Sequence, residues 1–208
     1  MSQISRTYGA SSVAELKAIY DDWATTYDKE LAEEEQNYVA PAIASAYVLK
    51  TLGVNRLSDD VEILDAGCGT GLVGIELAKV GAKKIDGVDL STGMLDVARA
   101  TGAYRALETV DLSQPLAREN GSYDIIMCVG TMTQGHVGPE ALDEFIRVLK
   151  KGGFLVATIL GYIWESGGYE TRVRELVDAG KATLVSADME DYRRGANVQA
   201  RMLVLQAN

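Results

Sequence analysis

The sequence predicts an α/β fold: a doubly wound, mostly parallel sheet of seven strands, with one antiparallel strand near the C-terminus and a helical cap at the N-terminus. From residue 61 onward, short apolar runs alternate with segments whose apolar residues recur at helical spacing. Strands that alternate with helices form a parallel sheet covered on both faces. The last two predicted strands have only a short link, so they must pair as an antiparallel hairpin. We expect a single domain, 1–208, with a cap over 1–55 and a core over 56–208.

The N-terminal part is predicted to be helical from about residue 11 to residue 52. Ser11 or Ser12 fits the N-cap position, because a hydroxyl there can accept a hydrogen bond from a backbone N–H of the first turn. Pro41 fits the first turn of a second helix, where its missing N–H removes no helical hydrogen bond. Gly53 fits the position that closes this helix.

The rest of the chain is predicted to alternate between strands and helices. Strands are expected at 61–64, 84–89, 105–110, 123–129, 154–160, 183–187 and 198–205, and helices at 72–80, 92–100, 139–149 and 169–179. Ligands of such sheets bind at the carboxyl ends of the strands, where the winding reverses. The residues that follow each strand are therefore the first candidates for a functional site.

Composition and charge narrow the classes of partner. Acidic residues outnumber basic ones by 30 to 20, a formal net charge of −10, which disfavours nucleic acid because its affinity comes largely from Lys and Arg. A small-molecule substrate fits better. Cys68 and Cys128 form no disulfide framework or metal motif, so no metal is expected. With no signal peptide and no apolar run near the roughly 20 residues of a membrane span, we expect a cytoplasmic protein that does not enter membranes. The oligomeric state is left open.

A glycine-rich turn, Asp65 to Gly71, follows the first strand and opens a helix. Glycine tolerates positive φ and lets a ligand approach the backbone closely, and the N–H groups at a helix start favour a negative group. Asp89 ends the second strand, where a carboxylate can accept hydrogen bonds from both hydroxyls of a ribose. Residues 69–74 also form a GxGxxG pattern, so dinucleotide binding is the first alternative. The preceding Asp65 and Gly67 count against it; a tight turn without a ligand is the other alternative.

Several segments together resemble the class I methyltransferases that use S-adenosylmethionine (SAM). Residues 61–71 resemble the first motif of that family, residues 87–95 its second-strand motif, and residues 111–116 the segment that reads adenine. Residues 123–126 and 149–153 are similar to its fourth strand and the approach to its fifth. Residues 20–28 resemble the cap signature of one branch of small enzymes, and the branch named for the Williams–Beuren syndrome region is the most similar. The resemblance covers nearly the whole chain and implies a Rossmann-like fold with SAM as cofactor.

The resemblance also implies roles for individual residues. The backbone of the glycine turn approaches the methionine part of SAM, whose ammonium pairs near Asp65, and Asp89 holds the ribose. Leu90 and Met94 enclose the adenine, and Asp111 with the Leu112 N–H bonds its edge. The full cofactor-binding set is Tyr20, Trp23, Tyr27, Asp65, Gly67, Cys68, Gly69, Thr70, Gly71, Asp89, Leu90, Met94, Asp111, Leu112 and Val129. From the residues alone, Leu90 and Met94 could equally be core, Asp111 a turn residue, and Cys68 a small loop residue.

Methyl transfer from a sulfonium depends mainly on alignment, and a base is needed only when the acceptor keeps a proton. His136, the one histidine, follows the fourth strand and is the candidate base or acceptor ligand; a loop residue is the alternative. The predicted acceptor-binding set is Thr131, Thr133, His136, Tyr162, Trp164 and Tyr169, although the aromatic members could equally be core. The expected function is SAM-dependent methyl transfer to a small molecule. A protein or RNA methyltransferase and a non-catalytic SAM-binding module remain as alternatives.

Overall fold

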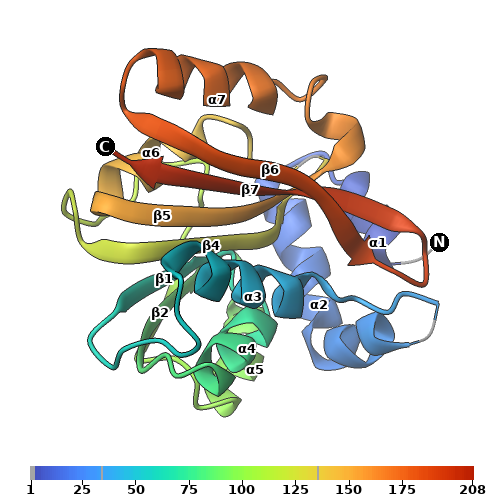
Figure 1. The fold of residues 1–208 in the computed structure, drawn as a ribbon. Coiled ribbons are helices and arrows are strands. Elements are labelled where there is room, and N and C mark those ends of the chain that lie inside the picture. The colour runs from blue at the N-terminus through green and yellow to red at the C-terminus, as the bar shows by residue number, and fades with distance from the viewer. Residues whose placement is uncertain (1–2, 34, 135) are drawn as a thin grey trace.

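The computed structural model describes residues 3–33, 35–134 and 136–208 and contains a seven-stranded sheet with helices on both faces (Figure 1). The strands are β1 (Glu62–Ala66), β2 (Lys84–Asp89), β3 (Ala106–Thr109), β4 (Tyr123–Met132), β5 (Leu149–Leu160), β6 (Ala182–Arg193) and β7 (Val198–Ala207). Their order in the sheet is β3-β2-β1-β4-β5-β7-β6. Only β7 runs antiparallel to its neighbours β5 and β6. This confirms the predicted Rossmann-like sheet, and its winding reverses between β1 and β4.

The helices are α1 (Gln3–Tyr8), α2 (Val13–Ala32), α3 (Ala40–Leu52), α4 (Leu72–Lys79), α5 (Thr92–Ala100), α6 (Ala141–Val148) and α7 (Tyr169–Asp178), with a 3₁₀ turn η1 (Gly161–Ile163). Ser12 caps α2 by accepting a hydrogen bond from Glu15 N–H, and Gly53 closes α3 with φ 68°, both as predicted. The predicted division of this segment into two helices is confirmed, with Pro41 in the first turn of α3. No helix within the described ranges is long and apolar enough to cross a membrane.

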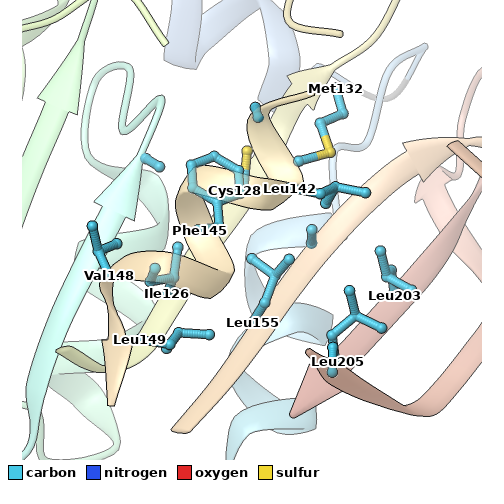
Figure 2. Packing of buried hydrophobic residues seen from close by; sticks show 14 of the residues in the cluster. Ile126, Cys128, Met132, Leu142, Phe145, Val148, Leu149, Leu155, Leu203 and Leu205 are labelled. Carbon is cyan, nitrogen blue, oxygen red and sulfur yellow. The ribbon is translucent and has the colours of Figure 1, made fainter. Parts of the chain in front are cut away.

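Each face of the sheet carries its own apolar core. Neighbouring residues of β4 belong to opposite cores: Ile125 packs with α3 and α4, whereas Ile126 packs with α6 and α7. Figure 2 shows Leu142 and Phe145 of α6 lying over Ile126 and Cys128. Because successive side chains of a strand point to opposite faces, a sheet covered on both sides needs continuous apolar runs, and this is the pattern that predicted it.

Two boundaries differ from the prediction. Leu149, expected at the end of a helix, begins β5 directly after α6. β6, expected to end near residue 187, continues to Arg193, and the turn to β7 is correspondingly shorter. The second half of β6 is rich in Asp and Glu, which are poor strand formers, but its pairing with β7 overrides that preference. The extension matters for function because it brings Tyr192 and Arg193 to the end of the sheet beside the site.

Candidate cofactor and acceptor site

A cavity lies at the carboxyl ends of β1, β2 and β4, where the winding reverses, with α2 on its other side. The space that it encloses together with its part open to solvent is about 750 Å³. We call it the first cavity. Of the residues predicted for the site, its lining includes Tyr20, Tyr27, Gly67, Gly69, Asp89, Leu90, Met94, Asp111, Leu112, Val129, Thr131 and His136.

Two aspartates of α2 attach the cap to the core. Asp21 accepts hydrogen bonds from the Ser91 hydroxyl at 2.6 Å and from Gly93 N–H at 3.0 Å. Asp28 accepts a bond from the Thr70 hydroxyl at 2.5 Å. The two carboxylates are seven residues apart, which places them on the same side of the helix, two turns apart. They hold α2 so that Tyr20 and Tyr27 line the cavity. Sequence reasoning missed this role, although the sevenfold spacing was a signal for it.

The glycine turn offers a ligand room more than hydrogen bonds. Gly67, Gly69 and Gly71 all have positive φ, at 79°, 52° and 96°. The N–H groups of Gly67 and Cys68 donate to the Val88 carbonyl, and that of Gly69 donates to Asp89. The N–H groups of these three residues are therefore already used, and the expectation of a negative group at the helix start concerns the N–H groups further along, at the first turn of α4. A Cβ on Gly67 would overlap the Thr131 hydroxyl. The packing of Thr131 of β4 against the turn after β1 therefore requires glycine at position 67.

We expect Gly67→Ala to destabilise the protein and to weaken SAM binding. A left-handed conformation alone costs an alanine about 1–2 kcal/mol, and the overlap with Thr131 adds to this cost. Gly53→Ala is the matched control, because Gly53 has φ 68° with no atom within 4 Å of its Cβ position, and it lies at the end of α3. Thermal unfolding and calorimetric titration with SAM measure both effects. Equal losses of stability in the two variants, with unchanged SAM affinity, would contradict the packing argument.

Asp89 presents both carboxylate oxygens at the cavity wall. Oδ2 accepts a hydrogen bond from Gly69 N–H at 2.8 Å, and Oδ1 accepts one from Ser91 N–H at 2.9 Å. Burial raises the pKa of this carboxyl above its usual value, against the lowering effect of those two bonds. Each oxygen retains a lone pair, so the group can accept two further bonds. Asp89 can therefore still accept hydrogen bonds from both ribose hydroxyls, as predicted.

Asp65 is fully buried and does not line the first cavity. Its Oδ2 accepts a hydrogen bond from the Tyr104 hydroxyl at 2.6 Å, and that hydroxyl accepts one from Gly74 N–H at 3.1 Å. Oδ1 has no hydrogen-bond partner. Burial, with the charge of Asp89 nearby, raises the pKa of Asp65 to about 7. A positive group in the cavity would lower this pKa, so Asp65 can act on a ligand's ammonium through its charge without contact.

The residues predicted to surround the adenine line the first cavity, and one of them, Asp111, also stabilises a turn. Leu90 and Met94 line it, and Met94 is nearly fully buried at 2% exposure. Asp111 Oδ1 accepts hydrogen bonds from both the N–H and the hydroxyl of Ser113, at 2.9 and 2.7 Å. Asp111 is thus a turn residue as well as a lining residue. Both bonds use Oδ1, which leaves Oδ2 for a ligand.

Four members of the predicted cofactor set, besides Asp65, do not line the first cavity: Trp23, Cys68, Thr70 and Gly71. The Cys68 thiol is buried within the turn, and its pKa is raised by that burial. Thr70 is turned toward Asp28, and Gly71 is the N-cap of α4. The predicted cofactor contacts of Cys68, Thr70 and Gly71 stay predictions, and these residues do not line the first cavity. Trp23 lies in a neighbouring cavity described below.

The aromatic residues predicted for the acceptor wall lie elsewhere. Trp164 and Tyr169 are 6% and 3% exposed and belong to the core on the α6 and α7 side. The Tyr169 hydroxyl donates to the Val137 carbonyl at 2.5 Å. Tyr162 is 57% exposed and lines neither cavity. Trp164 and Tyr169 are thus core residues, whereas Tyr162 interacts with the side chain of Tyr8, which lines the cavity described below, and its predicted acceptor role stays a prediction.

His136 is held by hydrogen bonds on both ring nitrogens. Nδ1 lies 2.8 Å from the Gln134 carbonyl oxygen and 2.9 Å from the Thr133 hydroxyl. A carbonyl only accepts, so Nδ1 carries the proton in the neutral ring. Nε2 then accepts a bond from the Tyr20 hydroxyl at 2.8 Å. Burial holds the pKa of His136 below its usual value, so the ring is neutral at pH 7. The lone pair of Nε2 accepts the hydrogen bond from Tyr20.

A second cavity adjoins the first. Both are lined by Tyr20, Tyr27 and Gly130. The other lining residues of the second cavity are Ile4, Thr7, Tyr8, Trp23, Leu31, Tyr38, Thr133, Tyr192 and Arg193. Two of the predicted residues, Trp23 and Thr133, are therefore found here. Tyr8, Tyr38, Tyr192 and Arg193 were missed, because no local motif marks them.

Comparisons of the sequence with known families and proteins all match methyltransferases. A family described as "Methyltransferase domain" matches residues 63–153, from β1 into β5. Methyltransferase-like protein 27 of Homo sapiens is 36% identical over 157 residues, 75% of this chain and 62% of that protein. The ubiquinone/menaquinone biosynthesis C-methyltransferase of Campylobacter jejuni is 31% identical over 166 residues, 76% of this chain and 68% of that protein. The chain thus spans less than two thirds of its human relative.

Solved structures share the fold over most of the chain. The [4+2]-cyclase SpnF aligns with a TM-score of 0.68 at 18% identity, covering 95% of this chain and 97% of that one. The magnesium protoporphyrin IX methyltransferase of Synechocystis, solved with bound SAM, aligns with a TM-score of 0.60 at 19% identity, covering 99% and 90%. At such identities the likeness concerns the fold, and the cyclase shows that one fold serves different reactions.

Proposed function

Because the chain belongs to the class I SAM-dependent methyltransferases, as its motifs indicated, we propose that it transfers the methyl group of SAM to a small-molecule acceptor. SAM is the cofactor of this family. The observation that carries the proposal is the pair of adjoining cavities: one at the reversal of the sheet with Asp89 on its wall, and one walled by tyrosines next to it. The first has the place and size for a cofactor, and the second has the place for an acceptor.

The residues of the first cavity fit the cofactor. Gly69 lines the cavity, and no atom lies within 4 Å of the position that a Cβ would take there. Asp89 would accept bonds from the ribose hydroxyls, and Leu90 and Met94 would enclose the adenine between apolar side chains. The buried carboxylate of Asp65, with its raised pKa, would favour a positive group nearby. When bound, SAM supplies an activated methyl group, and the protein's task is then to align the acceptor with it.

His136 and Tyr20 can remove a proton from a hydroxyl acceptor. Neutral His136 already accepts the Tyr20 hydroxyl proton in a hydrogen bond. Tyr20 lines both cavities. An acceptor hydroxyl next to Tyr20 would pass its proton to the tyrosine oxygen as the tyrosine proton moves to Nε2. Burial strongly raises the pKa of Tyr20, so the tyrosine would act as a relay and not as a free phenolate.

A small acceptor is favoured over a macromolecule. Aromatic side chains from α1, α2, the approach to α3 and β6 line the second cavity, and concave sites of this composition are typical of small-molecule binding. The net charge of −10 also disfavours RNA. Both cysteines are free and buried, which suits the reducing cytoplasm that we propose as its compartment.

We expect the purified protein to bind SAM and S-adenosylhomocysteine, but neither NAD nor NADP. The reason is that Asp65, the early glycine Gly67 and the adenine segment at Asp111 suit the SAM pattern and depart from the dinucleotide pattern. Calorimetric titration with all four compounds measures this. Binding of NAD without SAM would overturn the assignment. Incubation with labelled SAM and a metabolite mixture then tests transfer, because a non-catalytic module would bind SAM and label nothing.

A further inference from the structure

We propose that the methyl acceptor is an anionic small molecule with an aromatic or similarly flat body, whose carboxylate or phosphate binds Arg193 in the second cavity. This inference rests on the proposed function and names the substrate class of the same site. It is carried by the guanidinium of Arg193, which lines the cavity without an ion pair, by the charge of the remaining lining, and by the aromatic walls.

Arg193 is held in place but not neutralised. Its Nη1 donates to the Gln36 side-chain oxygen at 3.0 Å, and its guanidinium lies 6.0 Å from the centre of the Tyr192 ring. Its Nε is buried without a hydrogen-bond partner. No acidic residue within the described ranges forms an ion pair with it. The residue lines the second cavity, so an anionic group of a ligand there would pair with a guanidinium charge that no carboxylate of the described residues neutralises.

The charge of the second cavity differs from that of its surroundings. Among the described residues that line it, Arg193 is the one charged side chain. The first cavity instead carries Asp89 and Asp111, and the whole chain has a net charge of −10. The positive charge of Arg193 reaches the cavity, because it opposes the rise in pKa that burial causes at Tyr8 and Tyr192. The cavity is therefore selective for an anion within an acidic protein.

The walls around Arg193 are aromatic and closely packed. The Trp23 ring lies 6.2 Å from Tyr20, nearly parallel to it, and 4.6 Å from Tyr27. The Tyr38 and Tyr192 rings meet edge to face at 5.1 Å. Such walls pack well against a flat ring, since aromatic pairs prefer stacked and edge-to-face contacts. A flat body with an anionic group fits this combination better than a flexible or cationic acceptor.

The two cavities meet at Gly130, which has φ 83° and lines both. A Cβ there would lie 2.7 Å from the Tyr38 hydroxyl and 3.3 Å from that of Tyr192. Glycine at this position therefore lets the two tyrosine hydroxyls pack against the end of β4. An acceptor anchored on Arg193 could place its nucleophile beside Tyr20, which also lines both cavities and is bonded to His136.

The test uses a metabolite extract separated by ion exchange into anionic, neutral and cationic pools, each incubated with labelled SAM and the full chain. Arg193→Gln removes the positive charge. Arg193→Lys keeps the charge but replaces the planar guanidinium, with its parallel N–H donors, by an ammonium group. Arg194→Gln is the matched control, because Arg194 is the next residue, is exposed and pairs with Asp191. SAM affinity and thermal unfolding of each variant verify an intact fold.

We expect label in the anionic pool only, with products that mass spectrometry identifies as aromatic carboxylates or phosphates. Arg193→Gln should raise the KM for that pool at least about tenfold, as the loss of a charged hydrogen bond implies, with a smaller change in kcat. Arg193→Lys should recover part of the loss, and Arg194→Gln should match the wild type. Label in a neutral or cationic product, or an unchanged KM in a folded Arg193→Gln, would overturn this inference alone. Binding of SAM with no label in any pool would overturn the proposed function with it.

Discussion

His136→Ala is expected to lower the turnover of a hydroxyl acceptor by roughly 10²–10⁴-fold, the usual contribution of a general base. The substitution removes Nε2, which accepts the hydrogen bond from Tyr20. The affinity for SAM should change little, because the predicted cofactor contacts are made by Asp89 and its neighbours. Single-turnover rates with labelled SAM and the acceptor pool measure the loss. Wild-type rates in the variant would reduce His136 to a residue of the loop.

The pH dependence gives an independent measurement of the same role. Burial lowers the pKa of His136 from its usual 6.5, so the ring stays neutral and basic at pH 7. The wild-type rate should therefore fall as the pH falls through a value below 6.5, where His136 becomes protonated. The Tyr20→Phe variant distinguishes a proton relay through Tyr20 from direct removal of the acceptor proton by His136. If Tyr20 carries the proton, this variant loses rate as His136→Ala does; if His136 acts directly, its freed Nε2 sustains the rate.

Asp89→Ala is expected to weaken SAM binding at least about tenfold. It removes both acceptors for the ribose hydroxyls, and hydrogen bonds to charged groups contribute about 1.5–3 kcal/mol each. It also leaves Gly69 N–H and Ser91 N–H without the carboxylate that now orders them. Calorimetric titration with SAM and S-adenosylhomocysteine measures the change.

Asp96→Ala is the control for that variant, because Asp96 is an exposed aspartate of α5 whose side chain pairs only with Arg99 along the same helix. It removes the same charge at a position that lines neither cavity. Its SAM affinity should equal that of the wild type. An equal loss in both variants would mean that net charge matters and that Asp89 has no specific contact.

The turn after β1 and the end of β2 could be predicted because their signals are local. Positive φ at Gly67 and Gly71 requires glycine whatever packs nearby. An aspartate that ends an apolar strand, as Asp89 does, lies at the carboxyl edge of the sheet once the strand is recognised. The doubly wound sheet followed in the same way, from apolar runs buried on both faces.

The extent of β6 could not be predicted, because its pairing is not local. Its strongly polar second half joins the sheet through β7, and only this pairing carries Tyr192 and Arg193 to the site. Trp164 and Tyr169 show the opposite case. Their aromatic character suited a pocket wall or a core equally, and the path of the chain after β5 placed them in the core.

The sequence by itself determined the fold class, the family and the residues at the carboxyl ends of β1 and β2, since each depends on backbone conformation or strand ends within a short segment. Only the tertiary structure decided which residues line the second cavity, where we propose that the acceptor binds. Tyr8, Tyr20, Tyr38 and Arg193 come from α1, α2, the approach to α3 and the end of β6, and they meet in one cavity. Periodicity tells which face of each element is buried, but the choice of distant partner depends on how whole elements pack. That packing brought a cation and several aromatic rings together beside the predicted cofactor.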